Sequence, residues 1–439
     1  MKMAEVLGRV FLCECGRHHE VRIRDVLYAP DGISRLAGLM TGYFPGRTAN
    51  LVADRRTWEA AGKDLEKELK ALAWQVHVCL IPDPSHGDPV CDEATRALVE
   101  KAMIRPYQVL LAVGSGVAND LCKWIATDTK MPYAVVATAA SMNGYASANI
   151  APSIRGVKRV LDGVVPVCIA TTPAIIRDAP ARLTAAGLGD VVAKPVSMTD
   201  WRINHLLFNE YYCPRCAQLI RDIEPAYMDH PERIRQGDPA TLEALFQALI
   251  ASGIAMTIAG TSFPASGGEH MISHVLDMTA GMDGIPHDYH GRQVGLGTIF
   301  ASALYERLVV LEKPRFVERT EPTDAEYWRE LTPVVEEEHA HKRERVKWAV
   351  KRLRTPGVWD EARGLVRTGT VPAARIKNCL REAGAAHCID HIGCTRERFL
   401  AAILHSHQIR ERYTVIDLAR SAGILPSAAD EIVDQYLVK

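Results

Sequence analysis

Short apolar runs alternate with longer amphipathic stretches through the N-terminal part of the chain. Polar or glycine-containing turns bound each run, and the stretch that follows has hydrophobic residues at helical spacing. Strands that alternate with helices in this way form a parallel sheet with helices on its faces. The predicted strands cover residues 49–53, 75–81, 107–113, 133–137 and 164–170, and the predicted helices between them cover 57–72, 92–103 and 117–126.

Two parts of the chain depart from this alternation. The segment 10–36 is expected to be a small β-rich lead-in, because Val21-Arg22-Ile23-Arg24 alternates between apolar and charged residues. After Thr172-Pro173 the strand pattern fades and helical periodicity dominates. We therefore predict an α/β domain at 1–171 and a helical domain at 172–439. The C-terminal helices are predicted at 242–255, 270–278, 294–310, 324–331, 336–353, 396–403 and from Ser427 onward.

The bulk composition is that of a globular protein. The 439 residues are 48% hydrophobic and 24% charged, with a formal net charge of -1. Without a basic excess, nucleic acid is a poor candidate as a partner. No apolar run is expected to reach the length of a membrane span, and residues 1–5 lack a signal-peptide core. We expect a cytoplasmic protein. Its eleven cysteines, an odd number scattered along a chain without a signal peptide, favour reduced thiols over a disulfide framework.

Two groups of cysteines have the spacing of metal ligands. Cys13-Glu14-Cys15, followed closely by His18, is a plausible half of a zinc knuckle, and Cys213-Pro214-Arg215-Cys216 is a C-x-x-C motif. Together they have the ligand count of a structural zinc site. About two hundred residues separate them, however, and nothing in the sequence brings them together. Ordinary thiols are the default interpretation, and a structural metal stays open.

A glycine-containing loop follows the strand predicted at 107–113. In Gly114-Ser115-Gly116 the glycines would let the backbone approach a pyrophosphate, and the N-terminus of the next helix would offer free N–H groups. The match to G-x-G-x-x-G is incomplete, because the third position holds Asn119. The next strand ends in a second polar turn, 138–145. Since ligands bind at the carboxyl ends of neighbouring parallel strands, the two loops together favour a dinucleotide site.

Histidines cluster in the helical part. His270 and His274 are four residues apart and share one face of a predicted helix, and His287 and His290 follow shortly after. Upstream, Asp190 is expected in a glycine-rich turn that leads into a helix. Two imidazoles and a carboxylate with an open position suit a catalytic divalent metal.

Five ordered motifs resemble one enzyme family. They are Gly114-Ser115-Gly116 with Asp120 and Lys123, the turn 138–144, Gly187-Leu188-Gly189-Asp190 with Lys194 and Asp200-Trp201, the stretch 262–270 with His274, and 290–295. This order resembles glycerol-1-phosphate dehydrogenase, and most closely its AraM-like branch, over residues 10–425. The family is related to glycerol dehydrogenase, the iron-dependent alcohol dehydrogenases and dehydroquinate synthase.

The resemblance implies a dehydroquinate synthase-like fold, in which a Rossmann-like α/β nucleotide-binding domain precedes an all-α metal-binding domain. It implies that Asp190, His270 and His290 bind the metal, which is zinc, nickel or iron in the family. His274 would face the substrate, and Lys194 is a candidate for its phosphate or hydroxyl groups. The cofactor, NAD or NADP, is expected to contact Asp54, Gly114, Ser115, Gly116, Val117, Asp120, Thr138, Ser141, Asn143 and Ser147. Arg55 and Arg56 could accept a 2′-phosphate, so the choice between NAD and NADP stays open.

The implied reaction is reduction of dihydroxyacetone phosphate to sn-glycerol 1-phosphate, a step of phospholipid metabolism, by an enzyme expected to be a dimer or larger homo-oligomer. One departure bears on the substrate: Asn143 stands where the family commonly has an acid between nicotinamide and substrate. Another phosphorylated or phosphonate-bearing aldehyde or ketone is therefore an alternative. A cyclase of the dehydroquinate synthase type is another, although such cyclases usually have glutamate at the position of Asp190.

Overall fold

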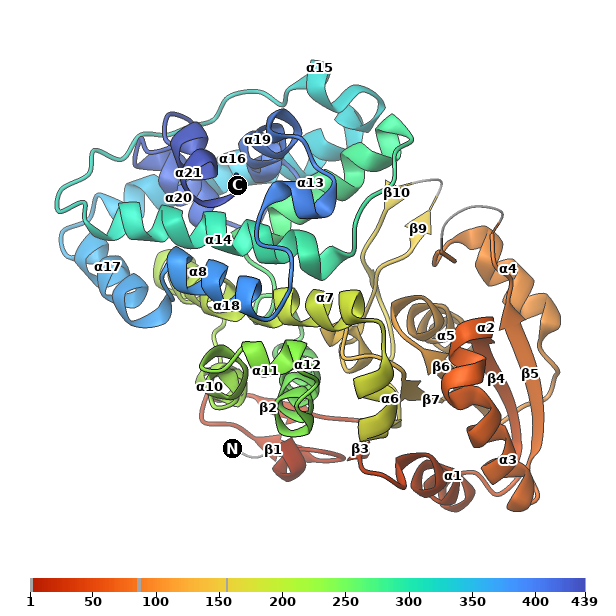
Figure 1. Cartoon of the computed structure of the whole chain (residues 1–439). Helices are drawn as coiled ribbons and strands as arrows, with labels where there is room; N and C mark the ends of the chain where they lie inside the picture. The colour runs from red at the N-terminus through yellow and green to blue at the C-terminus, as the bar shows by residue number, and fades with distance from the viewer. Residues whose placement is uncertain (1–2, 85–87, 155–156, 439) are drawn as a thin grey trace. The chain divides into compact units, whose positions relative to one another are not determined.

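The computed structural model describes residues 3–84, 88–154 and 157–438 (Figure 1). The chain forms two compact units. The first contains residues 1–187 and also 233–260, and the second contains 261–439 together with 188–217. Of the residues between these ranges, 218–227 belong to the first unit and 228–232 to the second. The division therefore passes through helix α9 (Pro214–Arg221), between Ala217 and Gln218. The chain first passes from one unit to the other after Gly187, later than the boundary predicted at residue 172.

The first unit is built on a six-stranded sheet in which every pairing is parallel. The strand order is β3-β12-β7-β6-β4-β5. Four of these strands, at or near the centre, are almost entirely buried and read as continuous apolar runs, because helices cover both faces of such a sheet. The strands are β3 (Asp25–Tyr28), β4 (Thr48–Asp54), β5 (Gln75–Ile81), β6 (Val109–Gly114), β7 (Tyr133–Ala137) and β12 (Cys168–Thr171).

The helices of this unit confirm the predicted alternation. The sheet is accompanied by α1 (Gly32–Tyr43), α2 (Arg55–Thr57), a π-helical turn η2 (Trp58–Gly62), α3 (Lys63–Ala71), α4 (Glu93–Ala102), α5 (Gly116–Thr129), a short turn η3 (Asn143–Tyr145), α6 (Pro173–Asp178) and α12 (Pro239–Ala259). Small two-stranded ladders pair β8 (Asn149–Ile150) with β11 (Leu161–Asp162) and β9 (Ser153–Ile154) with β10 (Val157–Lys158).

The lead-in differs from the prediction in two places. Its hairpin pairs β1 (Val10–Leu12) with β2 (His18–Glu20), whereas 21–24 lies between β2 and β3 and is not a strand. Val21 and Ile23 are buried as the alternation predicted, but they form no ladder: the N–H of Val21 donates to the carbonyl of Arg9, and the carbonyl of Ile23 accepts from the N–H of Gly8. The segment expected to extend to residue 36 already turns helical at Gly32, because Ile33, Leu36 and Met40 of α1 pack into the core at helical spacing.

The second unit is helical. It begins inside α7 (Ala181–Val191), at Leu188. Its main helices are α8 (Lys194–Phe208), α13 (Gly268–Asp283), α14 (His290–Val309), α15 (Ala325–Trp328), α16 (Thr332–Leu353), α17 (Val358–Gly369), α18 (Ala373–Glu382), α19 (Arg396–His405), α20 (Val415–Ser421) and α21 (Ala429–Tyr436). Short helices α10 (Glu224–Met228) and α11 (Glu232–Arg235) lie in the divided segment, and the turns η1 (Met3–Glu5), η4 (Arg329–Leu331), η5 (Ile389–Ile392) and η6 (Ser406–Gln408) complete the chain.

The glycines before Asp190 form helix, not the predicted turn. Gly187 and Gly189 lie inside α7. A Cβ atom on Gly189 would lie 2.0 Å from the carbonyl oxygen of Gly291, and one on Gly187 would lie 2.0 Å from that of Ala140. Glycine is therefore used here for close approach of neighbouring backbones, which a sequence pattern does not distinguish from a turn.

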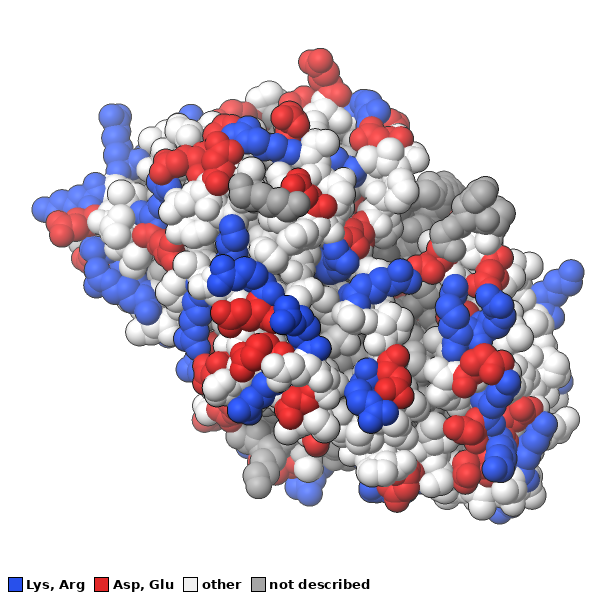
Figure 2. Space-filling view, in the orientation of Figure 1, with Lys and Arg blue, Asp and Glu red and all other residues white. Residues whose placement is uncertain are grey.

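Helix α12 is long and apolar enough to cross a membrane, which the sequence analysis did not expect of any segment. Within the protein, 78% of its apolar window is buried, as in the core helix of a globular domain. Elsewhere, on the face shown in Figure 2, Lys and Arg side chains are interspersed with Asp and Glu side chains. This mixture agrees with the formal net charge of -1.

Candidate active site

Three side chains that were predicted to bind a metal lie close together in the second unit. His270 is in the first turn of α13, His290 opens α14 and Asp190 is near the end of α7. His270 Nε2 lies 3.8 Å from Asp190 Oδ1, and the ring centroids of His270 and His290 are 5.1 Å apart. Asp190 and His270 are buried, whereas His290 is exposed. Two imidazoles beside a carboxylate form a donor set that suits a divalent ion.

The orientation of His270 is set by its neighbour in α13. Nδ1 of His270 lies 2.7 Å from Oε1 of Glu269, a fully buried carboxylate. Burial raises the pKa of Glu269 to about 7, and in its ionised form this carboxylate accepts the hydrogen of Nδ1, which leaves the lone pair of Nε2 for a metal. Burial, with the nearby Lys194 ammonium, lowers the pKa of His270 to about 3, so the imidazole is neutral at physiological pH. No role of Glu269 was predicted from the sequence.

His290 is held by hydroxyl and amide groups. Its Nδ1 lies 3.1 Å from the hydroxyl of Ser273, and that hydroxyl donates to Oε1 of Gln293 at 2.9 Å. Because the hydroxyl hydrogen points to Gln293, the Ser273 oxygen accepts from Nδ1–H of His290. Nε2 of His290 thus carries the lone pair, as in His270. Both imidazoles have the tautomer that a metal ligand needs, and each is fixed through its other nitrogen.

Lys194 and Asp190 form a buried ion pair. Nζ of Lys194 donates to Oδ1 of Asp190 at 2.9 Å and to the carbonyl of Ala265 at 3.2 Å, and both charged side chains are almost inaccessible. Burial opposes ionisation of Asp190, but the Lys194 ammonium outweighs it and the pKa of Asp190 is lowered. Lys194 therefore keeps Asp190 ionised, a positioning contact that the residue spacing alone did not reveal.

A second donor group overlaps the first. Ligand atoms of His274, Asp277 and His290 all lie within 4.8 Å of one another. The rings of His274 and His290 are stacked with centroids 5.4 Å apart, and Oδ1 of Asp277 lies 3.4 Å from Nδ1 of His287. Asp277 is three residues after His274 on the same helix face, so helical spacing could have identified it. The Asp190 group has the stronger case, because its imidazoles have fixed tautomers and its carboxylate is ionised.

The start of α13 is anchored by a buried carboxylate that the sequence analysis left without a role. Asp200 accepts hydrogen bonds from the backbone of Gly268 and Val415, both at 2.8 Å, and from the hydroxyl of Tyr305. Burial and the neighbouring Glu269 carboxylate nevertheless raise the pKa of Asp200 to about 8. Asp200 therefore ties the first turn of α13, which carries His270, to the start of α20.

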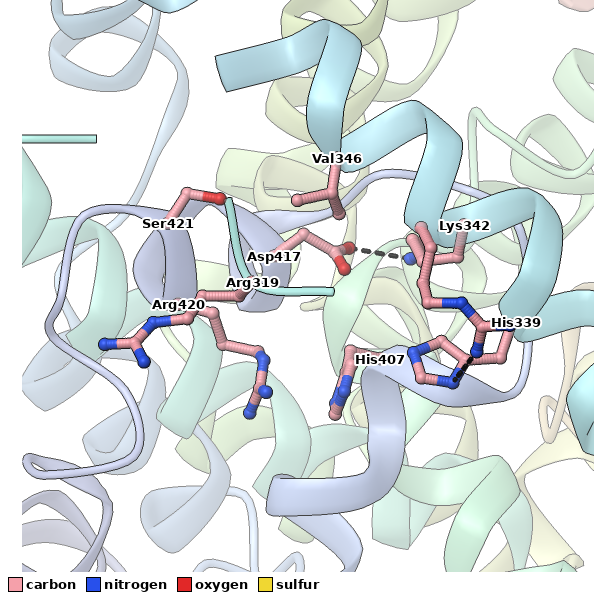
Figure 3. Close-up of a pocket in the computed structure, with 9 residues that line it drawn as sticks. Arg319, His339, Lys342, Val346, His407, Asp417, Arg420 and Ser421 are labelled. Carbon is pink, nitrogen blue, oxygen red and sulfur yellow. Dashed lines mark hydrogen bonds and ion pairs between the residues drawn. The ribbon is translucent and has the colours of Figure 1, made fainter. Parts of the chain in front are cut away.

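The segment around Val415 is held in turn by the buried pair drawn in Figure 3. Nζ of Lys342 donates to Oδ2 of Asp417 at 2.7 Å and to the carbonyl of Arg412. Asp417 also accepts from the backbone N–H of Thr414 at 2.8 Å. The guanidinium of Arg412 reaches the carbonyl of Ser266 and the hydroxyl of Ser262, in the loop before α13. These contacts fix the loop from which the first turn of α13 begins.

In the first unit, the predicted phosphate loop lies at a change of direction in the sheet. The chain runs from β4 outward to β5 and then crosses to β6 on the other side of β4. At such a point the loops after the two neighbouring strands separate and leave a crevice for a ligand. Gly114 ends β6, Ser115 precedes α5, and Gly116 and Val117 form its first turn. Asp54 ends β4, the other strand at this point.

The two polar loops predicted to bind the cofactor contact each other. The hydroxyls of Ser115 and Ser141 are 2.7 Å apart, and the backbone N–H of Thr138 donates to the carbonyl of Gly114. Asp120 accepts a hydrogen bond from the backbone N–H of Ala151 at 3.1 Å, so one of its two carboxylate oxygens is already bound to the protein backbone.

Lys123 is the residue that organises the second loop. Its buried ammonium donates to the carbonyls of Gly144, Ser147 and Asn149 at 2.7–2.9 Å, and burial lowers its pKa to about 8. The same loop packs against α12, where a Cβ on Gly253 would lie 2.4 Å from the carbonyl oxygen of Asn143. The position of Asn143 in η3 is thus fixed from two sides.

Asp54 has a structural role of its own. Its Oδ1 accepts from the backbone of Arg56 and Thr57 at 2.7 and 3.1 Å, which caps α2. Arg55 and Arg56 pair with Asp83 at 3.4 and 3.0 Å. The predicted contact of Asp54 with a ribose therefore depends on its second oxygen, and a 2′-phosphate would compete with Asp83 for the arginines.

Known proteins share both the sequence and the fold. The profile of the family described as iron-containing alcohol dehydrogenase matches residues 28–180. A Geobacillus thermodenitrificans protein named glycerol-1-phosphate dehydrogenase (NAD(P)+) is 32% identical over 73% of this chain and 79% of its own. A Pyrococcus furiosus protein of the same name is 34% identical over 64% and 78%. The chain belongs to the glycerol-1-phosphate dehydrogenase family.

Solved structures of other proteins share the fold of this chain. Glycerol dehydrogenase from Schizosaccharomyces pombe superposes with a TM-score of 0.61 at 14% identity, covering 94% of this chain and 91% of that one. Maleylacetate reductase from Agrobacterium tumefaciens superposes with a TM-score of 0.59 at 12% identity, covering 94% and 95%. The predicted fold class, a nucleotide-binding α/β domain followed by a helical domain, is confirmed.

Proposed function

We propose that the protein is an NAD(P)H-dependent, metal-containing dehydrogenase that reduces dihydroxyacetone phosphate to sn-glycerol 1-phosphate. The observation that carries this proposal is the pair of oriented imidazoles, His270 and His290, beside the ionised Asp190. Membership of the glycerol-1-phosphate dehydrogenase family supports the substrate. Cytoplasmic location and a homo-oligomeric state accompany this proposal as expectations from the sequence.

Asp190, His270 and His290 would hold the metal. The donor set accommodates zinc, iron or nickel, since affinity order and availability decide among them more than ligand type does. When bound, the ion would polarise the ketone oxygen of the substrate as a Lewis acid. The protein contributes orientation: Glu269 and Ser273 fix the two imidazoles, and Lys194 keeps the carboxylate ionised.

His274 is the residue we assign to face the substrate. It lies one helical turn after His270 in α13, with the two ring centroids 6.2 Å apart, and it is partly accessible whereas His270 is buried. An accessible imidazole beside the ligand group can give or accept a proton at the substrate oxygen. Lys194 is already engaged with Asp190 and Ala265, which supports a positioning role, and direct contact with the substrate remains a prediction.

The loops after β6 and β7 would bind the dinucleotide. Their place at the change of direction in the parallel sheet supports this assignment, together with the free N–H groups of the first turn of α5. The cofactor supplies the hydride. We assign the pyrophosphate to Gly114, Ser115, Gly116, Val117 and Asp120, and the nicotinamide half to Thr138, Ser141, Asn143 and Ser147.

One assay tests the reaction. Purified enzyme, loaded in turn with zinc, iron and nickel, is mixed with NADH or NADPH and dihydroxyacetone phosphate, and cofactor oxidation and sn-glycerol 1-phosphate are measured. We expect stoichiometric oxidation, and we expect none from His270→Ala. Turnover of substrate without net cofactor oxidation would instead indicate a cyclase-type reaction. If the cofactor is oxidised only with a phosphonate-bearing or another phosphorylated carbonyl compound, that compound and not dihydroxyacetone phosphate is the substrate.

A further inference from the structure

We propose that Arg412 binds the phosphate group of the substrate, an assignment that rests on the proposed function. A phosphate monoester carries a charge of about -1.5 to -2 at neutral pH, and the planar fork of an arginine is especially suited to bind it. The sequence offered Lys194 for this role. In the structure Lys194 is committed to the carboxylate of Asp190, so a different cation is the better candidate.

Arg292 and Arg412 differ in whether a carboxylate neutralises them. Arg292 follows His290 in α14, and its Nε lies 3.0 Å from Oδ2 of Asp288. Arg412 forms no ion pair with any residue that the structure describes, and its guanidinium contacts a hydroxyl, a carbonyl and an aromatic ring. Burial lowers the pKa of Arg412 to about 10 although Glu269 acts in the opposite direction, so the side chain is charged at physiological pH. Because desolvated charges are normally paired, an anionic ligand would supply the counter-ion.

Arg412 and Lys194 hold neighbouring carbonyls of one loop. Nζ of Lys194 donates to the carbonyl of Ala265 at 3.2 Å, and the guanidinium of Arg412 donates to the carbonyl of Ser266. This loop leads directly into the first turn of α13. Lys194 also contacts the proposed metal ligand Asp190. Both cations therefore lie beside the start of α13, where one neutralises a metal ligand and the other is left for the substrate.

Neutral groups hold the guanidinium of Arg412 in place. Its Cζ lies 3.9 Å from the centroid of the Phe263 ring, so the ring covers one face of the cation. One terminal nitrogen donates to the hydroxyl of Ser262 at 2.9 Å, and the other donates to the carbonyl of Ser266. The backbone carbonyl of Arg412 accepts from the ammonium of Lys342. A side chain fixed in this way loses little conformational freedom when a ligand binds, which favours affinity.

Enough hydrogen-bond donors remain for a phosphate. A guanidinium has five N–H groups, and the contacts to Ser262 and Ser266 occupy two of those in Arg412. The hydroxyl of Ser262 accepts from Arg412 and keeps its own hydrogen, which it can donate to a phosphate oxygen. Arg412 and Ser262 are both only partly buried, so an anion can approach them from solvent.

Selectivity between phosphorylated and unphosphorylated substrates tests the assignment. We expect Arg412→Gln to lower kcat/KM for dihydroxyacetone phosphate by roughly 10–100-fold, mainly through KM, and to change kcat/KM for dihydroxyacetone little. Arg410→Gln is the matched control, because Arg410 is nearby in the chain, more exposed and paired with Glu338 at 3.8 Å. An equal decrease for both substrates in Arg412→Gln would overturn the assignment, since damage to the metal site affects both.

Binding of inorganic phosphate tests Arg412 without turnover. Calorimetry is done on enzyme saturated with NADH or NADPH, which occupies the proposed dinucleotide loops. We expect weaker phosphate binding by Arg412→Gln and unchanged binding by Arg410→Gln, and equal affinities would overturn the proposal. If phosphate binding depends on Arg412 but dihydroxyacetone phosphate is not reduced, the proposed reaction fails and the anion site stands. If Arg412→Gln reduces dihydroxyacetone phosphate as efficiently as the wild type, the reaction stands and this assignment fails.

A conservative variant separates substrate binding from support of the loop before α13. Metal content and melting temperature are measured for each variant, because Arg412 also contacts this loop. If Arg412→Gln does not fold or loses its metal, Arg412→Lys replaces it as the probe, since lysine keeps the charge but lacks the planar fork. We expect Arg412→Lys to bind metal and to keep only part of the preference for the phosphorylated substrate. Unchanged kinetics, or an equal loss for both substrates, would overturn the assignment.

Discussion

Nδ1 of His270 lies 2.7 Å from Oε1 of Glu269, the residue that precedes it in α13. Glu269 also accepts the backbone N–H of Gly267 at 2.7 Å, so the carboxylate is fixed to the turn that begins the helix. The direction of the His270 imidazole is therefore set by a contact inside its own helix turn, and Nε2 is left facing Asp190 at 3.8 Å. Metal binding should depend on Glu269 almost as much as on the proposed ligands.

Replacement of Glu269 by glutamine should weaken the metal site without abolishing the fold. The amide oxygen can still accept from Nδ1, but it lacks the charge that makes the imidazole more basic. Loss of such a supporting contact typically lowers metal affinity about 10–100-fold, and we expect a decrease of that size for Glu269→Gln. Competition with a chromogenic chelator measures the affinity. The exposed Glu326→Gln serves as control, and equal affinities of the two variants would contradict the assigned role.

The two overlapping donor groups can be separated by their carboxylates. We expect Asp190→Asn to lose the catalytic metal and activity, and Asp277→Asn to retain most of both, as measured by metal analysis and turnover. Asparagine is a better probe than alanine, because its amide oxygen can still accept from Lys194, whereas alanine would remove both the charge and the acceptor, at a cost of about 3–5 kcal/mol. The double variant Asp190→Ala/Lys194→Met restores neutrality if stability is limiting. The reverse pattern would place the metal at His274, Asp277 and His290.

The glycines of the phosphate loop should respond differently to alanine. A Cβ on Gly116 would lie 3.5 Å from Sδ of Met142, an ordinary contact, whereas one on Gly114 would lie 2.7 Å from Cβ of Ala118. Gly116→Ala should therefore keep its melting temperature but raise the dissociation constant of NAD(P)H about tenfold or more, roughly 1.4 kcal/mol. Gly114→Ala should also lower the stability. Unchanged cofactor binding by a folded Gly116→Ala enzyme would count against this loop as the pyrophosphate site.

Asn143→Asp should change which substrate is preferred. An added carboxylate near an anionic substrate costs about 4 kcal/mol at 4 Å and an effective dielectric of 20, before screening by water and the metal. We expect kcat/KM to fall for dihydroxyacetone phosphate and for a phosphonate analogue relative to dihydroxyacetone. A uniform change across the three compounds would indicate that Asn143 only supports its turn.

Asp200 should make stability depend on pH. Burial raises its pKa from 3.8 to about 8 in the folded protein. Between these values the folded state binds more protons than the unfolded chain, so the free energy of unfolding falls as pH rises, by up to about 1.4 kcal/mol per pH unit. Asp200→Asn should flatten this slope from pH 4 to 8 in denaturant titrations. An unchanged slope would show that Asp200 is ionised in the folded protein, as its three hydrogen-bond donors favour.

The sequence predicted those features that depend on neighbouring residues. The apolar runs predicted at 107–113 and 133–137 became buried parallel strands, and the run at 75–81 became a partly exposed strand at the edge of the sheet, because periodicity and flanking turns are local properties. The helix that carries His270 followed from spacing in the same way, whereas the helix predicted at 294–310 begins earlier, at His290 itself. The glycines at 187 and 189 were assigned to a turn, since only the backbone at Gly291 and Ala140 shows why a helix needs glycine there.

The sequence by itself determined the alternating architecture, the family and the set of residue types that can bind a metal. Tertiary structure decided how they are used. It gave His270 its tautomer through Glu269, and it charged Asp190 through Lys194. It also decided that His19 is buried and the adjacent His18 exposed, because the two side chains point to opposite faces of β2. The reason is physical: desolvation, charge pairing and metal geometry depend on distances in space, and distant residues acquire those distances only when the chain folds.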